Sequence, residues 1–311
     1  MRVNIGVDVG GTKIAAGAVD DNGEILALVR KPTPASSSNA VADTIGECVK
    51  ELAGSYDVEA IGIGAAGFVD RERTTVVFAP NLAWRNEPLA EKVSQATGYR
   101  VVVENDANAA AWGEFKFGAA SEHSSAVVVT VGTGIGGGII VDGALLRGAG
   151  GFAGEIGHIV VNPGGQRCGC GVLGCWEAQA SGTALVRIAR QLAADSPVYG
   201  ARMLKLAGDR EITGLDVTRA AQADDPAALE CFAEIAEWIG IGMATLSAAI
   251  DPEVFVLAGG VSESGDLLAV PARTSFEKSL TAKEFRPAPL VKLAILGNNA
   301  GIIGAADLAR R

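Results

Sequence analysis

The chain has 311 residues, 49% of them hydrophobic, so it can bury the core of one large or two medium domains and is not a disordered protein. Its formal net charge of −10, with no long Lys/Arg cluster, argues against nucleic acid as a partner. The N-terminus reaches a charged residue too early for a signal peptide. The longest apolar stretch, near Trp238–Ile250, predicts a buried helix rather than a membrane span. Five cysteines without a secretory signal favour a reducing cytoplasm.

The first part of the chain predicts three strands followed by alternating helices and strands. A glycine turn at residues 10–12 and a hairpin turn at residues 20–23 separate the first three β-rich segments. Apolar residues at helical spacing then alternate with short apolar runs. The predicted strands are Val3–Val9, Lys13–Val19, Glu24–Lys31, Ala60–Gly64 and Val101–Val103, and the predicted helices are Val41–Tyr56, Leu89–Gly98 and Ala107–Phe117.

The second part of the chain follows a connection at residues 118–125 and opens again with a strand, a glycine turn and a strand. Residues 7–12 and 129–134 are similar strand–turn units, which predicts an internal duplication of two α/β halves that face a cleft. The predicted strands here are Ala126–Val131, Ile135–Val141 and Val254–Ala258, and the predicted helices are Thr183–Ala194, Val217–Ala223, Pro226–Ile250 and Asn298–Leu308.

Three glycine-rich turns follow predicted strands, at residues 8–13, 132–138 and 257–261. None has the spacing of a Walker loop. Their glycines nevertheless let backbone N–H groups approach phosphate oxygens, and two of the turns add a threonine hydroxyl. A hairpin turn is the simpler explanation for any one of them, whereas the three together favour nucleotide binding. Asp8, which precedes the first turn, could hold Mg²⁺ directly or through water.

Cysteines cluster in the middle of the chain. Cys168, Cys170 and Cys175 fall within eight positions, and His158 lies ten residues before the first of them. Three thiolates and one imidazole are enough to close a tetrahedral zinc shell, and the intervening glycines allow the turns that bring the sulfurs together. We expect such a site to hold a loop in place. A zinc finger for nucleic acid is the alternative, but Arg167 is the only basic residue in this segment.

Carboxylates occupy two further informative places. Asp106 follows a strand and opens a helix beside Asn105, a pattern typical of an N-cap. An aspartate there can also act as a general base that takes a hydroxyl proton while the oxygen attacks phosphorus. Glu155 and Glu177 flank the cysteine cluster. Either one alone would be surface charge, but two carboxylates on a metal-fixed frame suit the paired hydroxyls of a sugar.

Together these residues resemble the ROK family, the repressor, open-reading-frame and kinase group, and within it the bacterial glucokinases. The resemblance covers essentially the whole chain. Its most specific part is Glu155-x-x-His158 followed by Cys168-x-Cys170-Gly-x-x-Gly-Cys175-x-Glu177.

The resemblance implies an α/β, ribonuclease-H-like fold of the actin and hexokinase type, with two domains around a cleft. We expect a smaller α/β domain from residues 1–117 and 298–311. Residues 118–297 would form a larger α/β domain that carries the zinc-binding loop.

The resemblance also implies a role for individual residues. Asp106 would be the catalytic base, and Mg²⁺ would arrive with ATP near Asp8. The sugar would contact Gly67, Asn81, Asn105, Asp106, Glu155, His158 and Glu177. The phosphates would lie near Gly10, Gly11, Thr12, Lys13, Thr133 and Gly134, the adenosine near Gly259 and Gly260, and a structural Zn²⁺ would take His158, Cys168, Cys170 and Cys175.

The implied activity is ATP-dependent phosphorylation of the 6-hydroxyl of glucose. The motifs read hydroxyls that several hexoses share, so N-acetylmannosamine, N-acetylglucosamine, fructose, allose and mannose are alternative substrates. A non-catalytic sugar sensor is the alternative outside enzymes, although a phosphate loop starting at Asp8 leaves no room for the DNA-binding segment of the family's repressors. The resemblance further implies a dimer or tetramer and polyphosphate as a second donor. The charge, the cysteines and the hydropathy predict a cytoplasmic protein with no nucleic-acid or membrane partner.

Overall fold

The computed structural model describes residues 1–80 and 82–311, so the expected sugar contact Asn81 lies outside the described residues. The chain divides into two compact units. Unit 1 comprises Met1–Val127, Gly137–Gly154 and Ile295–Arg311, and unit 2 comprises Val128–Gly136 and Glu155–Ala294. The domain boundaries expected from the sequence stay a prediction, because a compact unit need not be a domain.

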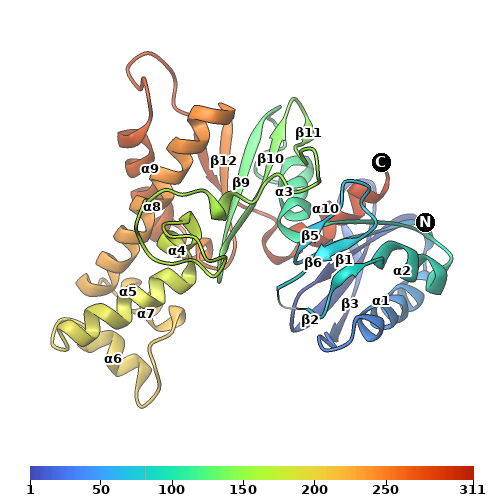
Figure 1. Cartoon of the computed structure of the whole chain (residues 1–311), viewed down its shortest axis with the longest axis horizontal. Coiled ribbons are helices and arrows are strands. Elements are labelled where there is room, and N and C mark those ends of the chain that lie inside the picture. The colour runs from blue at the N-terminus through green and yellow to red at the C-terminus, as the bar shows by residue number, and fades with distance from the viewer. Residues whose placement is uncertain (81) are drawn as a thin grey trace. The chain divides into compact units, whose positions relative to one another are not determined.

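The main sheet of unit 1 has the strand order β3-β2-β1-β4-β8 (Figure 1). β1 pairs antiparallel with β2 and parallel with β4, and β4 pairs parallel with β8. The central strand β1 is buried continuously from Val3 to Val7, as expected for a strand that is covered on both faces. The strands are β1 (Arg2–Val9), β2 (Lys13–Val19), β3 (Ile25–Pro32), β4 (Asp57–Ala65) and β8 (Arg100–Asn105).

Among the described residues of unit 1, the α-helices are α1 (Ser38–Ala53), α2 (Leu89–Thr97), α3 (Asp106–Phe117) and α10 (Ala300–Ala309). α1 begins after Ser37, whose hydroxyl accepts a hydrogen bond from the N–H of Ala40. α2 ends at Gly98, whose φ of 80° is the left-handed glycine C-cap that the sequence predicted. α3 and α10 pack against each other, and α10 also contacts β1 and β4.

α10 approaches the sheet so closely that two strand positions have no room for a side chain. A Cβ atom at Gly6 would lie 1.8 Å from the carbonyl oxygen of Ile302, and one at Gly62 would lie 1.7 Å from that of Ala305. Glycine is therefore required at both positions, because it lets the helix backbone contact the strand backbone directly.

A small antiparallel sheet of unit 1 was not expected from the sequence. Its strands β5 (Phe68–Val69), β6 (Val76–Phe78) and β7 (Arg85–Glu87) are too short to show a period of two. The turn between β5 and β6 is closed by Asp70, whose carboxylate accepts hydrogen bonds from the N–H groups of Thr74 and Thr75. This sheet follows Gly67 directly and so fixes the segment next to it.

The second five-stranded sheet has the order β11-β10-β9-β12-β13. Numbered by appearance within each sheet, both sheets run 3-2-1-4-5, which agrees with the internal duplication predicted from the two strand–turn units. Its strands are β9 (Ala126–Val131), β10 (Ile135–Val141), β11 (Ala144–Leu145), β12 (Val254–Ala258) and β13 (Leu290–Leu293).

Most helices of unit 2 pack against α8 (Pro226–Ile250), which begins after the Asp225 cap at the predicted residue (Figure 1). Among the described residues, α8 alone is long and apolar enough to cross a membrane, but half of its apolar window is buried inside the protein. Trp176 Nε1 donates a hydrogen bond of 2.8 Å to the Trp238 carbonyl of α8. The predicted buried helix is thus confirmed. Its neighbours are α4 (Trp176–Ala180), α5 (Gly182–Asp195), α7 (Gly214–Ala221) and α9 (Asp266–Ser279), and α6 (Ala201–Ala207) packs on α5 and α7.

Candidate functional site

In unit 1, three neighbouring parallel strands end at the same level. Val9 of β1 is in register with Ala65 of β4, which is in register with Asn105 of β8. Asp8 precedes the end of β1, and Asp106 follows the end of β8 directly. Ligands of open α/β sheets bind outside the carboxyl ends of the strands, so the register brings both aspartates to the edge where chemistry is expected.

Asn105 caps helix α3, and the interpretation of Asp106 as the N-cap is therefore wrong by one residue. Asn105 Oδ1 accepts a hydrogen bond of 3.0 Å from the N–H of Asn108, and Asn105 Nδ2 donates one of 3.1 Å to the carbonyl of Gly67. Asp106 is the first helical residue, and its Oδ1 accepts a bond of 2.9 Å from the N–H of Ala107. Because Asn105 caps the helix, the carboxylate of Asp106 is not used as a cap.

The two aspartates of unit 1 have perturbed pKa values. Burial raises the pKa of Asp8 to about 6; the negative charge of Asp106 adds to this shift, and Lys13 opposes it. Burial also raises the pKa of Asp106 above its ordinary value, although backbone N–H groups partly counteract the effect. A carboxylate with a raised pKa is a stronger proton acceptor, which suits a general base.

The first glycine-rich turn joins β1 to β2. The N–H of Gly10 donates a hydrogen bond of 3.0 Å to the Lys13 carbonyl, and Thr33 Oγ1 donates one of 2.7 Å to the carbonyl of Gly10. Thr12 and Lys13 are exposed on this turn, and Gly11 is half-buried. An exposed hydroxyl and an exposed ammonium beside small residues are groups that can approach a phosphate.

In unit 2, the segment from Glu155 to Cys175 has little regular structure. A short 3₁₀ turn spans Ile156–His158, and isolated β-bridges pair Val160 with Cys175 and Arg167 with Leu173. Backbone hydrogen bonds outside regular elements also hold this loop. They include bonds from the N–H of Val161 to the Gly174 carbonyl at 3.0 Å and from the N–H of Cys168 to the Val172 carbonyl at 2.9 Å.

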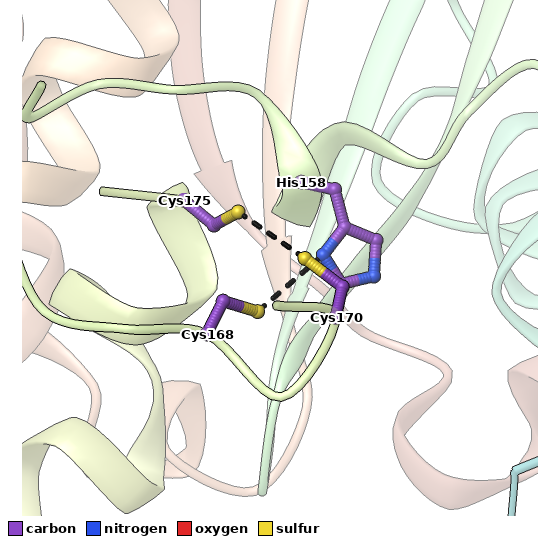
Figure 2. Close-up of side chains that lie close together, drawn as sticks. All are labelled: His158, Cys168, Cys170 and Cys175. Carbon is purple, nitrogen blue, oxygen red and sulfur yellow. Dashed lines mark hydrogen bonds between the residues drawn. The ribbon is translucent and has the colours of Figure 1, made fainter. Parts of the chain in front are cut away.

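The four expected metal ligands meet inside this loop (Figure 2). The ligand atoms of His158, Cys168, Cys170 and Cys175 all lie within 4.8 Å of one another. The Sγ atoms of Cys170 and Cys175 are 3.6 Å apart, and His158 Nδ1 is 3.7 Å from Cys168 Sγ. Zn–S bonds of about 2.3 Å place tetrahedral ligand atoms roughly 3.8 Å apart, so the four residues fit such a shell.

The thiols of the cluster differ in their readiness to ionise. Burial raises the pKa of Cys175 to about 12 and raises that of Cys168, whereas a hydrogen bond from the N–H of Val172 is the main cause that lowers the pKa of Cys170. A metal binds the thiolate form, so its binding must displace protons from the two buried thiols.

Glu177 is not a free surface charge, which was the simpler interpretation of the sequence. Its Oε2 accepts a hydrogen bond of 3.1 Å from the N–H of Ile135, and its Oε1 lies 3.6 Å from Cys168 Sγ. A Cβ atom at Gly134 would lie only 2.0 Å from Glu177 Oε2. Glu177 thus ties the cysteine loop to the glycine-rich turn between β9 and β10.

A cavity of about 1040 Å³ adjoins that turn within unit 2. Thr183 on α5 holds the rim, because its Oγ1 donates a hydrogen bond of 2.7 Å to the Thr133 carbonyl. Gly259, with φ of 87°, would place a Cβ atom 2.6 Å from the Val131 carbonyl oxygen. The volume suits a nucleoside. Sequence reasoning placed Thr133 and Gly260 here but missed the other lining side chains, which include Arg187, Arg190, Gln222 and Glu263.

The sheets, the turns and the Cys/His cluster together define a member of a known family. The model of the ROK family matches residues 4–311, and the chain belongs to this family, as the sequence motifs predicted. The predicted α/β fold class of the actin and hexokinase type is likewise confirmed, because the similar solved structures include a ROK glucokinase and a ROK hexokinase.

Individual relatives match over nearly their whole length. The chain is 49% identical to the glucokinase of Streptomyces coelicolor, and the alignment covers 100% of this chain and 98% of that protein. A ROK family glucokinase from Streptomyces griseus, solved in complex with glucose and AMPPNP, is 50% identical with a TM-score of 0.89, and 99% of each chain is covered. The ROK hexokinase from Thermus thermophilus is 37% identical with a TM-score of 0.84, covering 98% of this chain and 97% of that one.

Proposed function

We propose that the protein is a glucokinase, which transfers the γ-phosphoryl group of ATP to the 6-hydroxyl of glucose. Its similarity to a glucokinase solved with glucose and AMPPNP supports both substrates. The observation that carries the chemistry is the β8–α3 junction, where Asn105 caps the helix and leaves the Asp106 carboxylate, with its raised pKa, available to a substrate.

In the proposed reaction, Asp106 accepts the proton of the 6-hydroxyl as that oxygen forms its bond to the γ-phosphorus and the bond to the β-phosphate oxygen breaks. ADP leaves with the electron pair of that broken bond. The sugar is oriented by Gly67 and Asn105, together with Glu155, His158, Glu177 and Asn81.

ATP would lie against both glycine-rich turns. Gly10–Lys13 and Thr133–Gly134 would approach the phosphates, while Gly259–Gly260 and the cavity beside them would take the adenosine. Asp8 would hold Mg²⁺, which offsets the charge of the transferring phosphoryl group when bound.

The Cys/His cluster would bind a structural Zn²⁺. Its four protein ligands complete a tetrahedral shell and leave no position for a reactive water. His158 presents Nδ1 to the sulfurs, so Nε2 on the other side of the ring is available to the sugar. We further propose a cytoplasmic dimer or tetramer.

The test is an assay over a sugar panel that follows ADP release with ATP as the donor and formation of the sugar phosphate with polyphosphate as the donor. We expect the highest kcat/KM with ATP and glucose, compared with N-acetylmannosamine, N-acetylglucosamine, fructose, allose and mannose. A higher kcat/KM for another sugar would reassign the substrate. Sugar binding in calorimetry without phosphorylation of any sugar by either donor would identify a sensor instead.

A further inference from the structure

A buried carboxylate lies directly behind the proposed catalytic junction. Glu104 is the last residue of β8 before Asn105, and only 1% of its surface is exposed. Its Oε2 forms ion pairs with Nε of Arg147 at 2.8 Å and Nε of Arg73 at 3.2 Å. Glutamate is rarely buried unless it is paired with a positive charge. The two guanidinium groups are therefore what allows this carboxylate to be buried in unit 1.

The other oxygen of Glu104 holds the catalytic segment. Oε1 accepts a hydrogen bond of 3.0 Å from the N–H of Asn105 and one of 3.2 Å from Nδ2 of Asn108. Asn105 and Asn108 are themselves joined by the capping bond of α3. The carboxylate therefore fixes both the peptide that leads into Asp106 and the first turn of its helix.

The two arginines bring a second segment to the same carboxylate. Arg147 also donates hydrogen bonds of 2.8 Å to the Asp70 carbonyl and 2.7 Å to the Arg71 carbonyl. The Arg73 carbonyl accepts a bond of 2.9 Å from the N–H of Val103 on β8. The turn that carries residues 70–73 follows Gly67, whose carbonyl accepts the side-chain bond of Asn105.

These contacts form a closed ring. It runs from Glu104 to Asn105, across to Gly67, along the chain to Asp70, through Arg147 and back to Glu104. The link between Arg147 Nε and Glu104 Oε2 is an ion pair without hydrogen-bond geometry, and the other side-chain links of the ring are hydrogen bonds. Such a closed ring of contacts restrains the direction of Asn105 and Asp106 more tightly than a strand end alone. Buried ion pairs add little net stability, because desolvation offsets their attraction, so orientation is the property that this cluster supplies.

We propose that Glu104, held by Arg73 and Arg147, is a positioning residue for phosphoryl transfer, which fixes the side chains of Asn105 and Asp106 against the substrate hydroxyl. The inference rests on the proposed function, in which Asp106 is the base. Displacement of a reacting group by about 1 Å costs roughly 100-fold in rate.

The first variant is Glu104→Gln, which keeps the size and one acceptor oxygen but removes the charge between the arginines. We expect kcat per folded molecule to fall about 10- to 100-fold, while KM for ATP stays within about twofold. The matched control is Glu87→Gln, because Glu87 is a buried carboxylate of unit 1 that pairs with Lys92 outside the ring. It should lower the melting temperature and leave kcat per folded molecule unchanged. Equal kcat values in the two variants would overturn the proposal.

A second variant keeps the test decisive if Glu104→Gln does not fold. Arg147→Lys retains the positive charge but cannot make the three separate contacts of the guanidinium group. We expect the same selective loss of kcat, and wild-type kcat in this variant would contradict the proposal.

A double-mutant cycle separates this inference from the proposed function. If Glu104 acts through Asp106, Glu104→Gln should lower kcat in the wild-type background and leave the residual rate of Asp106→Asn unchanged. Additive losses would show that Glu104 does not act through Asp106. Full activity of Asp106→Asn alone would instead overturn the base assignment, whatever Glu104 does.

Discussion

The two units hold their polar site residues by different means. In unit 1, Asn105 and Asp106 lie where a buried strand becomes a helix, and hydrogen bonds and the Glu104 ion pairs restrain them. In unit 2, Glu155 and His158 begin an irregular loop that is held by two isolated β-bridges and scattered backbone hydrogen bonds, and four potential metal ligands converge inside it. The contrast teaches that a strand or helix that ends at the site can position a side chain by its own hydrogen bonds. We expect an irregular loop, in comparison, to need a metal cross-link as well.

The largest expected effect is a loss of kcat on substitution of Asp106 in unit 1. Asp106→Asn should lower kcat by about 10²- to 10⁴-fold, because the amide cannot accept the hydroxyl proton. Glucose affinity, measured by calorimetry, should change only a few-fold. Asp43→Asn on the exposed face of α1 is the control and should match the wild type in both measurements. Near-full activity of Asp106→Asn would remove the catalytic role from unit 1.

The next effect tests whether backbone packing is what makes unit 1 rigid. Gly62→Ala would force a methyl group against the Ala305 carbonyl, so we expect a loss of about 3 kcal/mol or more in stability, measured by calorimetric melting. Gly46→Ala in α1 is the matched control, because its Cβ would lie 3.5 Å from that of Ala96, an ordinary contact. That variant should be neutral or gain up to about 1 kcal/mol from helix propensity. Equal melting temperatures of the Gly62→Ala and Gly46→Ala variants would mean that α10 can shift away from the added methyl group at little cost in stability.

The third prediction concerns the cross-link of unit 2. Cys168→Ala should lose bound zinc, measured by elemental analysis, and weaken glucose binding about 10- to 100-fold, although no cysteine is among the proposed sugar contacts. Cys231→Ala removes a buried thiol of α8 outside the cluster and should keep both the metal and the affinity. Loss of zinc with unchanged glucose affinity would show that the loop does not need its cross-link.

The smallest expected effect is a pH-dependent change in stability at Asp8. Its pKa of about 6 lies above the ordinary 3.8, so the ionised carboxylate destabilises the folded state above pH 6 by at most about 3 kcal/mol. Without ATP and Mg²⁺, Asp8→Asn should therefore be about 1 kcal/mol more stable than the wild type at pH 7.5. The advantage should disappear as the pH falls from about 6 to below 4. A pH-independent difference in melting temperature would exclude ionisation as its cause.

The sequence predicted those elements whose pattern is local. The hairpins of the first sheet followed from their turns, and α8 followed from Asp225-Pro226 at its start and Asp251 at its end. In contrast, the strands β5, β6 and β7 are too short for a pattern, and α9 contains an internal proline, Pro271. These elements form because the rest of the fold packs against them.

The candidate site divides in the same way. The four metal-ligand types and the Asn105-Asp106 pair could be predicted from the sequence, because each is a short motif. The importance of Glu104 could not, because its partners Arg73 and Arg147 come from distant parts of the chain and reach it only after folding. The hydrogen bond from the Ile135 N–H to Glu177 could not be predicted either, because the two residues are far apart in the sequence.

The contact of α10 with β1 and β4 also sets the order in which the two units can fold during synthesis. The residues of α10 leave the ribosome after all of unit 2, yet Gly6 and Gly62 are shaped to receive this helix. Unit 2 can begin to fold on the nascent chain, whereas the first sheet must wait for α10 with an apolar surface uncovered. The first sheet, although it is synthesised first, is therefore the part of unit 1 that is completed last.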